Sequence, residues 1–181
     1  MKFSVILALP ALFGVLPLAG LAAENPYAGM EQRPIKALSE GEVGDYLAGR
    51  GMGTSRVAEL NHYPGPRHVL DHAGQLGLSP AQIEQVQQVH DAMADEARRI
   101  GRRIVLKEAE LEGLYASSQA TAENTQRVVR ELAALQADYR LAHLNAHLSM
   151  KLLLSPQQIA AYDRVRGYDG TNAAGHGHKR H

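Results

Sequence analysis

Two histidines in the last third of the chain have the spacing of a metal-binding pair. His143 and His147 stand four positions apart, so on a helix both imidazoles leave the same face and can reach one ion. His68 and His72 repeat this spacing earlier in the chain. Imidazole nitrogen is a suitable ligand for Zn²⁺, Ni²⁺, Co²⁺ or Cu²⁺. The pattern therefore predicts a divalent transition-metal site built from these four side chains.

Further side chains could complete such a site. His90 falls at a core position of a predicted long helix, and Met150 offers a weak thioether ligand. The competing interpretation is structural, because i, i+4 histidines arise by chance in a His-rich chain and a histidine in a helix seam is usually hydrogen-bonded rather than ligating. Three histidines of the tail, at 176, 178 and 181, could also bind metal loosely.

A basic band is the second group of side chains with a possible function. Its members are Arg98, Arg99, Arg102 and Arg103. They form two i, i+4 pairs beside the apolar seam of one helix, where they could attract unfolded protein chains by charge before apolar contact. The alternative is a solvated helix face balanced by neighbouring glutamates. Gly101, in the middle of the band, could permit a close helix approach or a local bend.

Composition argues against several classes of protein. The chain has 181 residues and no Cys, which excludes disulfides, thiolate metal sites and a Cys nucleophile. Its 19 basic and 19 acidic residues argue against nucleic-acid binding driven by bulk charge. The segment between His143 and His147 lacks the Glu of a His-Glu-x-x-His zinc-enzyme motif. We expect no enzyme and no nucleic-acid partner.

The first residues have the pattern of an export signal. Lys2 precedes an apolar run from Val5 to Leu21, which ends in small residues. We place a signal peptide at residues 1–22, with cleavage after Ala22 or alternatively Ala23, although an uncleaved anchor is the other possibility. Export to a bacterial periplasm is the simplest localisation.

Helix-start signals divide the mature chain, residues 23–170, into short and long helices. A capping box at Ser39 predicts a helix ending near Gly49, and Pro66 can begin another that runs to Leu76. Boxes at Ser79 and Ser155 begin a long helix to about position 117 and a last helix to about 168. A second long helix is expected over 122–153, and residues 171–181 have the composition of a disordered tail.

The two long helices should pair through heptad seams as an elongated hairpin, the first being about 55 Å long. The second helix carries another apolar stripe on its far side: Leu141, Leu144, Leu148 and Leu152. A helix that is apolar on two faces must be covered on both. Either the short N-terminal helices or a second subunit should therefore cover this stripe.

The chain resembles the LTxxQ-motif superfamily, which includes Spy/CpxP-type periplasmic chaperones, zinc-resistance-associated proteins and periplasmic heavy-metal sensors. The resemblance rests on Leu-Ser-Pro-Ala-Gln-Ile at 78–83 and Leu-Ser-Pro-Gln-Gln-Ile at 154–159, which flank the predicted hairpin. Ser79 and Ser155 stand where the family usually has Thr, a neutral change for capping. Stretches at 48–53, 59–61, 63–66 and 68–70, and the His-Leu pairs at 143 and 147, look like the metal-sensor branch.

The resemblance implies an all-α, elongated four-helix protein that forms a homodimer. Both metal handling and chaperoning occur in the family, so the resemblance does not choose between them. We favour divalent transition-metal binding in envelope metal sensing or heavy-metal resistance, with a membrane sensor or regulator as a candidate partner. His68, His72, His143 and His147 match the family's arrangement of metal ligands. The alternative function is an ATP-independent periplasmic chaperone, whose basic amphipathic face binds unfolded envelope proteins.

Overall fold

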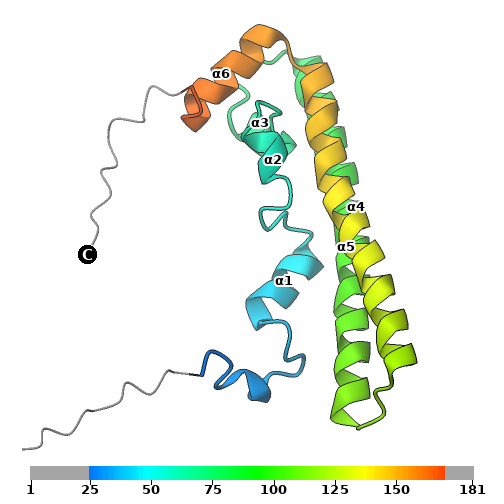
Figure 1. Ribbon diagram of the computed structural model, residues 1–181. Helices are drawn as coiled ribbons and strands as arrows, with labels where there is room; N and C mark the ends of the chain where they lie inside the picture. The colour runs from blue at the N-terminus through cyan, green and yellow to red at the C-terminus, as the bar shows by residue number, and fades with distance from the viewer. Residues whose placement is uncertain (1–24, 170–181) are drawn as a thin grey trace, which may run out of the picture.

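The computed structural model describes residues 25–169 and is all-α over that range (Figure 1). Its elements are a 3-10 turn, Met30–Gln32, and the helices α1 Glu40–Ala48, α2 Arg56–Glu59, α3 Pro66–Asp71, α4 Pro80–Ala116, α5 Ala122–Leu153 and α6 Pro156–Arg166. No helix within residues 25–169 is both long and apolar enough to cross a membrane. The predicted signal peptide and the C-terminal tail lie outside the described residues.

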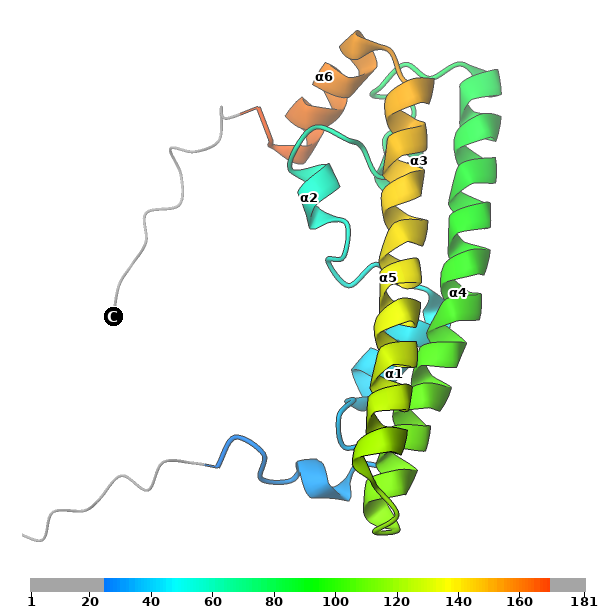
Figure 2. The same cartoon turned by 45° about the vertical axis from the view of Figure 1, so that its right-hand side comes forward.

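The long helices α4 and α5 form the predicted hairpin (Figures 1 and 2). The Ser79 hydroxyl accepts from the Gln82 amide, and the Gln82 side chain accepts from the Ser79 amide, so the capping box begins α4 with Pro80 in its first turn. The distal core of the hairpin contains Ala97, Ile100, Ile104, Val128, Leu132, Leu135 and Tyr139. Along α4 and α5 these residues recur in steps of three and four, which confirms heptad seams over this part of the predicted hairpin.

The three short helices run along one side of the hairpin (Figures 1 and 2). Tyr46 of α1 packs its ring edge against Tyr139 of α5, with centroids 5.3 Å apart. The helix ends at Gly49, whose φ of 70° lies in the left-handed region that glycine adopts readily. The chain then continues through a loop and the short helix α2, so residues 49–65 lie beside the C-terminal half of α5.

Helix α6 folds back over α2 and α3 at the end of the hairpin that lies opposite its turn (Figure 1). A second core joins α3, α4, α5 and α6 there: Val69, Leu76, Val86, Met150, Leu154, Ile159 and Tyr162. This core holds α3 and α6 against the hairpin.

Two predicted helices end earlier than expected. The helix from Pro66 stops at Asp71 rather than Leu76, because His72 leaves helical geometry at φ −115° and ψ 16° and turns follow as far as Gly77. Helix α6 stops at Arg166 rather than near position 168, because Gly167 adopts a left-handed cap.

The second apolar stripe of α5 remains largely exposed. The exposed fractions of Leu141, Leu148 and Leu152 are 51%, 52% and 88%. The short N-terminal helices therefore leave Leu141, Leu148 and Leu152 of the stripe exposed, whereas Leu144 is partly buried.

Candidate functional site

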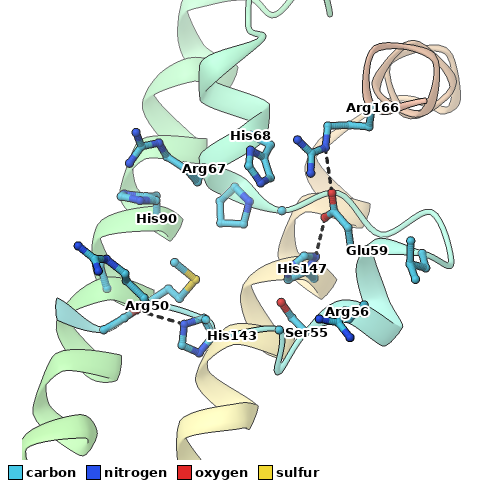
Figure 3. A pocket seen from close by; sticks show the side chains of 18 of the residues that line it. Arg50, Ser55, Arg56, Glu59, Arg67, His68, His90, His143, His147 and Arg166 are labelled. Carbon is cyan, nitrogen blue, oxygen red and sulfur yellow. Dashed lines mark hydrogen bonds and ion pairs between the residues drawn. The ribbon is translucent and has the colours of Figure 1, made fainter. Parts of the chain in front are cut away.

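A pocket of about 670 Å³ lies where the loop after α1, the helix α3 and the long hairpin meet (Figure 3). Four histidines line it: His68 from α3, His90 from α4, and His143 and His147 from α5. The structure thus brings together three of the four predicted principal ligands and one of the two additional ones.

His143 lies at the base of this pocket and is only 4% exposed. Its Nδ1 is 2.9 Å from the carbonyl oxygen of Tyr139, and its Nε2 is 3.3 Å from the carbonyl oxygen of Gly49. A neutral imidazole has one N–H, so it cannot donate to both oxygens. A second proton or a bound cation would remove this mismatch.

His147, one turn further along α5, is 6% exposed. Its Nδ1 is 2.7 Å from the carbonyl oxygen of Tyr63 and 3.8 Å from a carboxylate oxygen of Glu59. An Nδ1–H donated to the Tyr63 carbonyl leaves a lone pair on Nε2, which has no hydrogen bond to any residue in the range 25–169. Metal-ligating histidines usually have this arrangement, in which a carbonyl holds the other ring nitrogen.

His68 and His90 lie at the rim of the pocket and are partly exposed. The Nδ1 of His68 is 3.6 Å from Asp71, and that of His90 is 3.0 Å from Asp91. Burial and then the positive charge of Arg166 lower the pKa of His68 below its ordinary value. His68 therefore stays neutral, and able to ligate, at a lower pH than a free histidine.

The two remaining predicted ligands lie elsewhere. His72 has its Nδ1 2.8 Å from the Gln75 side chain and does not line the pocket. Met150 is fully buried in the core shared by α3, α4, α5 and α6. The thioether at the pocket belongs instead to Met93, three positions after His90 on the same helix. The i, i+3 spacing from His90 is the sequence signal that would have identified Met93 as a candidate ligand.

Glu59 is a further pocket residue that the sequence did not single out. Its Oε1 accepts from the Tyr162 hydroxyl at 2.6 Å and from Arg166 Nε at 3.3 Å. Burial, and next the hydrogen bond to Glu59, raise the pKa of Tyr162 well above its usual range. Since Glu59 also faces His147, this carboxylate joins the pocket to α6 (Figure 3). Only the fold brings these distant positions together.

The pocket has suitable donors for a transition metal, but they are not yet gathered into one site. Among residues 25–169, no three His, Cys, Asp or Glu side chains stand close enough together to hold an ion. A metal site would therefore require the partly exposed rings of His68 and His90 to leave Asp71 and Asp91 and turn toward the base of the pocket.

The arginine band divides between two surfaces. Arg98 lines the pocket and pairs with Asp95 at 2.5 Å. Arg99 pairs with Glu96 at 2.5 Å on the exposed face of α4. Arg102 and Arg103 are exposed and make no ion pair with any residue that the structure describes. The alternative interpretation, a solvated helix face balanced by acidic neighbours, therefore fits Arg98 and Arg99 but not Arg102 and Arg103.

In comparisons with known proteins, the chain matches no family model, no curated protein and no solved structure.

Proposed function

We propose that the protein binds a divalent transition-metal ion in this pocket and acts in envelope metal sensing or heavy-metal resistance in the periplasm. One observation carries the proposal. His143 and His147 are buried on one face of α5, and the Nδ1 atom of each is directed at a main-chain carbonyl. Such carbonyls fix the tautomer and the ring orientation of a ligating histidine. Nε2 of His147, which has no hydrogen bond within residues 25–169, can then bind the ion, whereas Nε2 of His143 must first leave the Gly49 carbonyl oxygen at 3.3 Å.

The ligand set we favour omits two of the predicted residues and adds one. His143 and His147 are the buried pair, and His68, His90 and Met93 complete the set from α3 and α4. His72 and Met150 are left out because neither lines the pocket. Nitrogen ligands with one thioether suit copper, nickel, cobalt or zinc better than calcium or magnesium.

Calorimetric titration of the metal-free protein with Zn²⁺, Ni²⁺, Co²⁺ and Cu²⁺ tests this proposal. The tail histidines are replaced by alanine, so that only the pocket is measured. We expect one ion per chain with a dissociation constant of about 1 μM or tighter. A His143→Ala/His147→Ala double variant should lose this binding, whereas the matched control His62→Ala/His72→Ala should keep it. Binding that survives in the first double variant contradicts the proposal.

A second function, ATP-independent chaperoning, is favoured by one exposed surface. Arg99, Arg102, Arg103 and Leu106 follow i, i+3, i+4 and i+7 spacing, so they share one face of α4. Leu106 is 69% exposed there. A basic face with an exposed leucine could bind unfolded clients by charge and apolar contact.

Aggregation assays with reduced α-lactalbumin separate the two functions. If chaperoning operates, the triple variant R99S/R102S/R103S should lose aggregation suppression while it retains metal binding. The histidine double variant should behave in the opposite way. If neither variant changes the aggregation of the client, this face has no chaperone role.

We also propose that a second copy of the chain covers the exposed leucines of α5. Burial of apolar surface contributes roughly 25 cal/mol per Å², so these side chains favour association. Sedimentation velocity should detect a dimer that a Leu148→Lys/Leu152→Lys variant dissociates. The exposed Val57 of α2 lies outside the stripe, and Val57→Lys should leave the dimer intact.

A further inference from the structure

The same pocket has a strong excess of positive charge. Five arginines line it: Arg50, Arg56, Arg67, Arg98 and Arg166. Glu59 is the single carboxylate among the lining residues. Figure 3 shows Arg67 near His90, Arg166 near His68 and Arg56 on the side of His147, so these guanidinium groups do not gather at one corner of the pocket.

Four of these five arginines pair with a carboxylate, so the excess positive charge rests on Arg56 and on how readily the exposed pairs open. Glu59 already accepts hydrogen bonds from Tyr162, Tyr168 and Arg166. Three aspartates outside the pocket lining pair with other arginines: Asp45 with Arg50 at 2.6 Å, Asp71 with Arg67 at 3.1 Å, and Asp95 with Arg98 at 2.5 Å.

Those three pairs are at the surface. The side chains of Arg50 and Arg67 are each 70% exposed, and such ion pairs add little stability and exchange partners readily. Arg56 makes no ion pair with a residue in the described range. Arg56 is therefore available to a ligand directly, and Arg50 and Arg67 become available when the ligand replaces their exposed carboxylate partners.

We propose that this pocket binds a small oxyanion with at least two negative charges, a polycarboxylate or a polyphosphate. Guanidinium groups form paired hydrogen bonds with carboxylates and phosphates, and bidentate geometry makes such contacts selective. Ala48, Leu60 and Met93 add apolar surface that can contact a carbon skeleton. The volume lies within the range of about 300–1,000 Å³ that small-molecule sites have.

Glycines in the lining bring main-chain groups to the pocket. A Cβ added at Gly51 would lie 3.3 Å from the His143 ring, and one added at Gly65 would lie 3.1 Å from the His147 ring. Side chains at these positions would crowd the space in front of both histidines. The lack of a side chain there keeps the base of the pocket accessible to a ligand.

This inference goes beyond metal binding and does not depend on it. The arginine-rich lining opposes a free dication electrostatically wherever its charge is not balanced, and a bound anion reduces that opposition. By linkage, an anion that favours metal binding is itself bound more tightly when metal is present. Anion binding alone should be measurable on the metal-free protein.

Calorimetry on the metal-free full chain at low ionic strength tests the proposal, with tricarballylate, pyrophosphate and acetate as probes. We expect one tricarballylate or pyrophosphate per chain and at least about tenfold weaker binding of acetate, because a monoanion engages fewer guanidinium groups. Tighter binding of tricarballylate would identify a carboxylate site, and tighter binding of pyrophosphate a phosphate site. The absence of saturable binding by either one overturns the proposal.

Charge variants locate the binding. Arg56→Gln/Arg67→Gln should weaken it by about tenfold or more. Arg130→Gln/Arg140→Gln, which removes two exposed arginines of α5 outside the pocket, should leave it unchanged. Equal losses in both double variants would mean non-specific charge attraction and overturn the proposal. If the His143→Ala/His147→Ala variant still binds the anion, anion binding does not depend on the proposed metal site.

Discussion

Gly101 of α4 lies directly against the main-chain carbonyl of Tyr46 in α1. A Cβ added at Gly101 would lie 2.0 Å from the Tyr46 oxygen, which is far inside van der Waals contact. The glycine therefore permits a close helix approach, one of the two roles that its mid-helix position suggested. This contact sets α1 on the hairpin three residues before Gly49, whose carbonyl contacts His143.

Gly101→Ala should separate α1 from α4. Alanine alone favours a helix by about 1 kcal/mol over glycine, but the clash with Tyr46 should outweigh this and destabilise the fold by about 2 kcal/mol. Gly113→Ala in the same helix is the matched control, since nothing lies within 4 Å of its added Cβ. Urea unfolding should show the control equal to or more stable than the parent protein. Equal midpoints for both variants would contradict the close approach.

Tyr162→Phe should loosen the attachment of α6. The hydroxyl donates to Glu59 and accepts from the Gly65 amide at 3.3 Å, so its loss removes a donor from a nearly buried carboxylate. Hydrogen bonds to charged groups contribute about 1.5–3 kcal/mol, and we expect a loss of stability of about 2 kcal/mol in denaturant unfolding. Tyr115→Phe, at a position 60% exposed, should change stability little. A similar loss in both variants would point to a general effect of removing a hydroxyl.

His68 should titrate below the ordinary histidine pKa of 6.5. Burial and then Arg166 disfavour its protonated form in the folded chain, so the unfolded chain binds the proton more tightly. The contribution of His68 to stability is therefore fully present above pH 6.5 and is lost as the pH falls through the lower, folded-state pKa. NMR titration of the imidazole signals measures this shift. Arg166→Gln should raise the pKa of His68, whereas Arg164→Gln, an exposed change on the same helix, should not.

Met93→Leu should weaken binding of a soft metal selectively. Thioether sulfur prefers Cu⁺ to Zn²⁺, so Cu⁺ affinity should fall by about tenfold while Zn²⁺ affinity changes little. Met150→Leu makes the same chemical change in the core outside the pocket and should leave Cu⁺ affinity unaltered. Competition with a chromogenic Cu⁺ chelator measures both variants. If Met150→Leu lowers Cu⁺ affinity more than Met93→Leu does, Met150 is the thioether ligand, as the sequence predicts.

Local sequence determined the helices of this protein. The boxes at Ser39, Ser79 and Ser155 form as predicted, because a capping side chain and its partner lie within one turn of each other. The middle of the long seams is equally local, since helical periodicity alone places Ile100 and Leu132 on the buried faces. The early end of α3 was not predicted, because no local signal at His72 stops a helix.

Tertiary structure decided what the helices build. The i, i+4 spacing placed His143 and His147 on one helix face, but their burial depends on the segment between α1 and α3, which supplies the Gly49 and Tyr63 carbonyls. The choice of Met93 over Met150 depends on which side of the hairpin α3 occupies. The contact between Glu59 and Tyr162 joins positions 103 residues apart. A sequence specifies a helix through near neighbours, whereas a pocket depends on how separate helices pack, and that packing minimises exposed apolar surface over the whole chain.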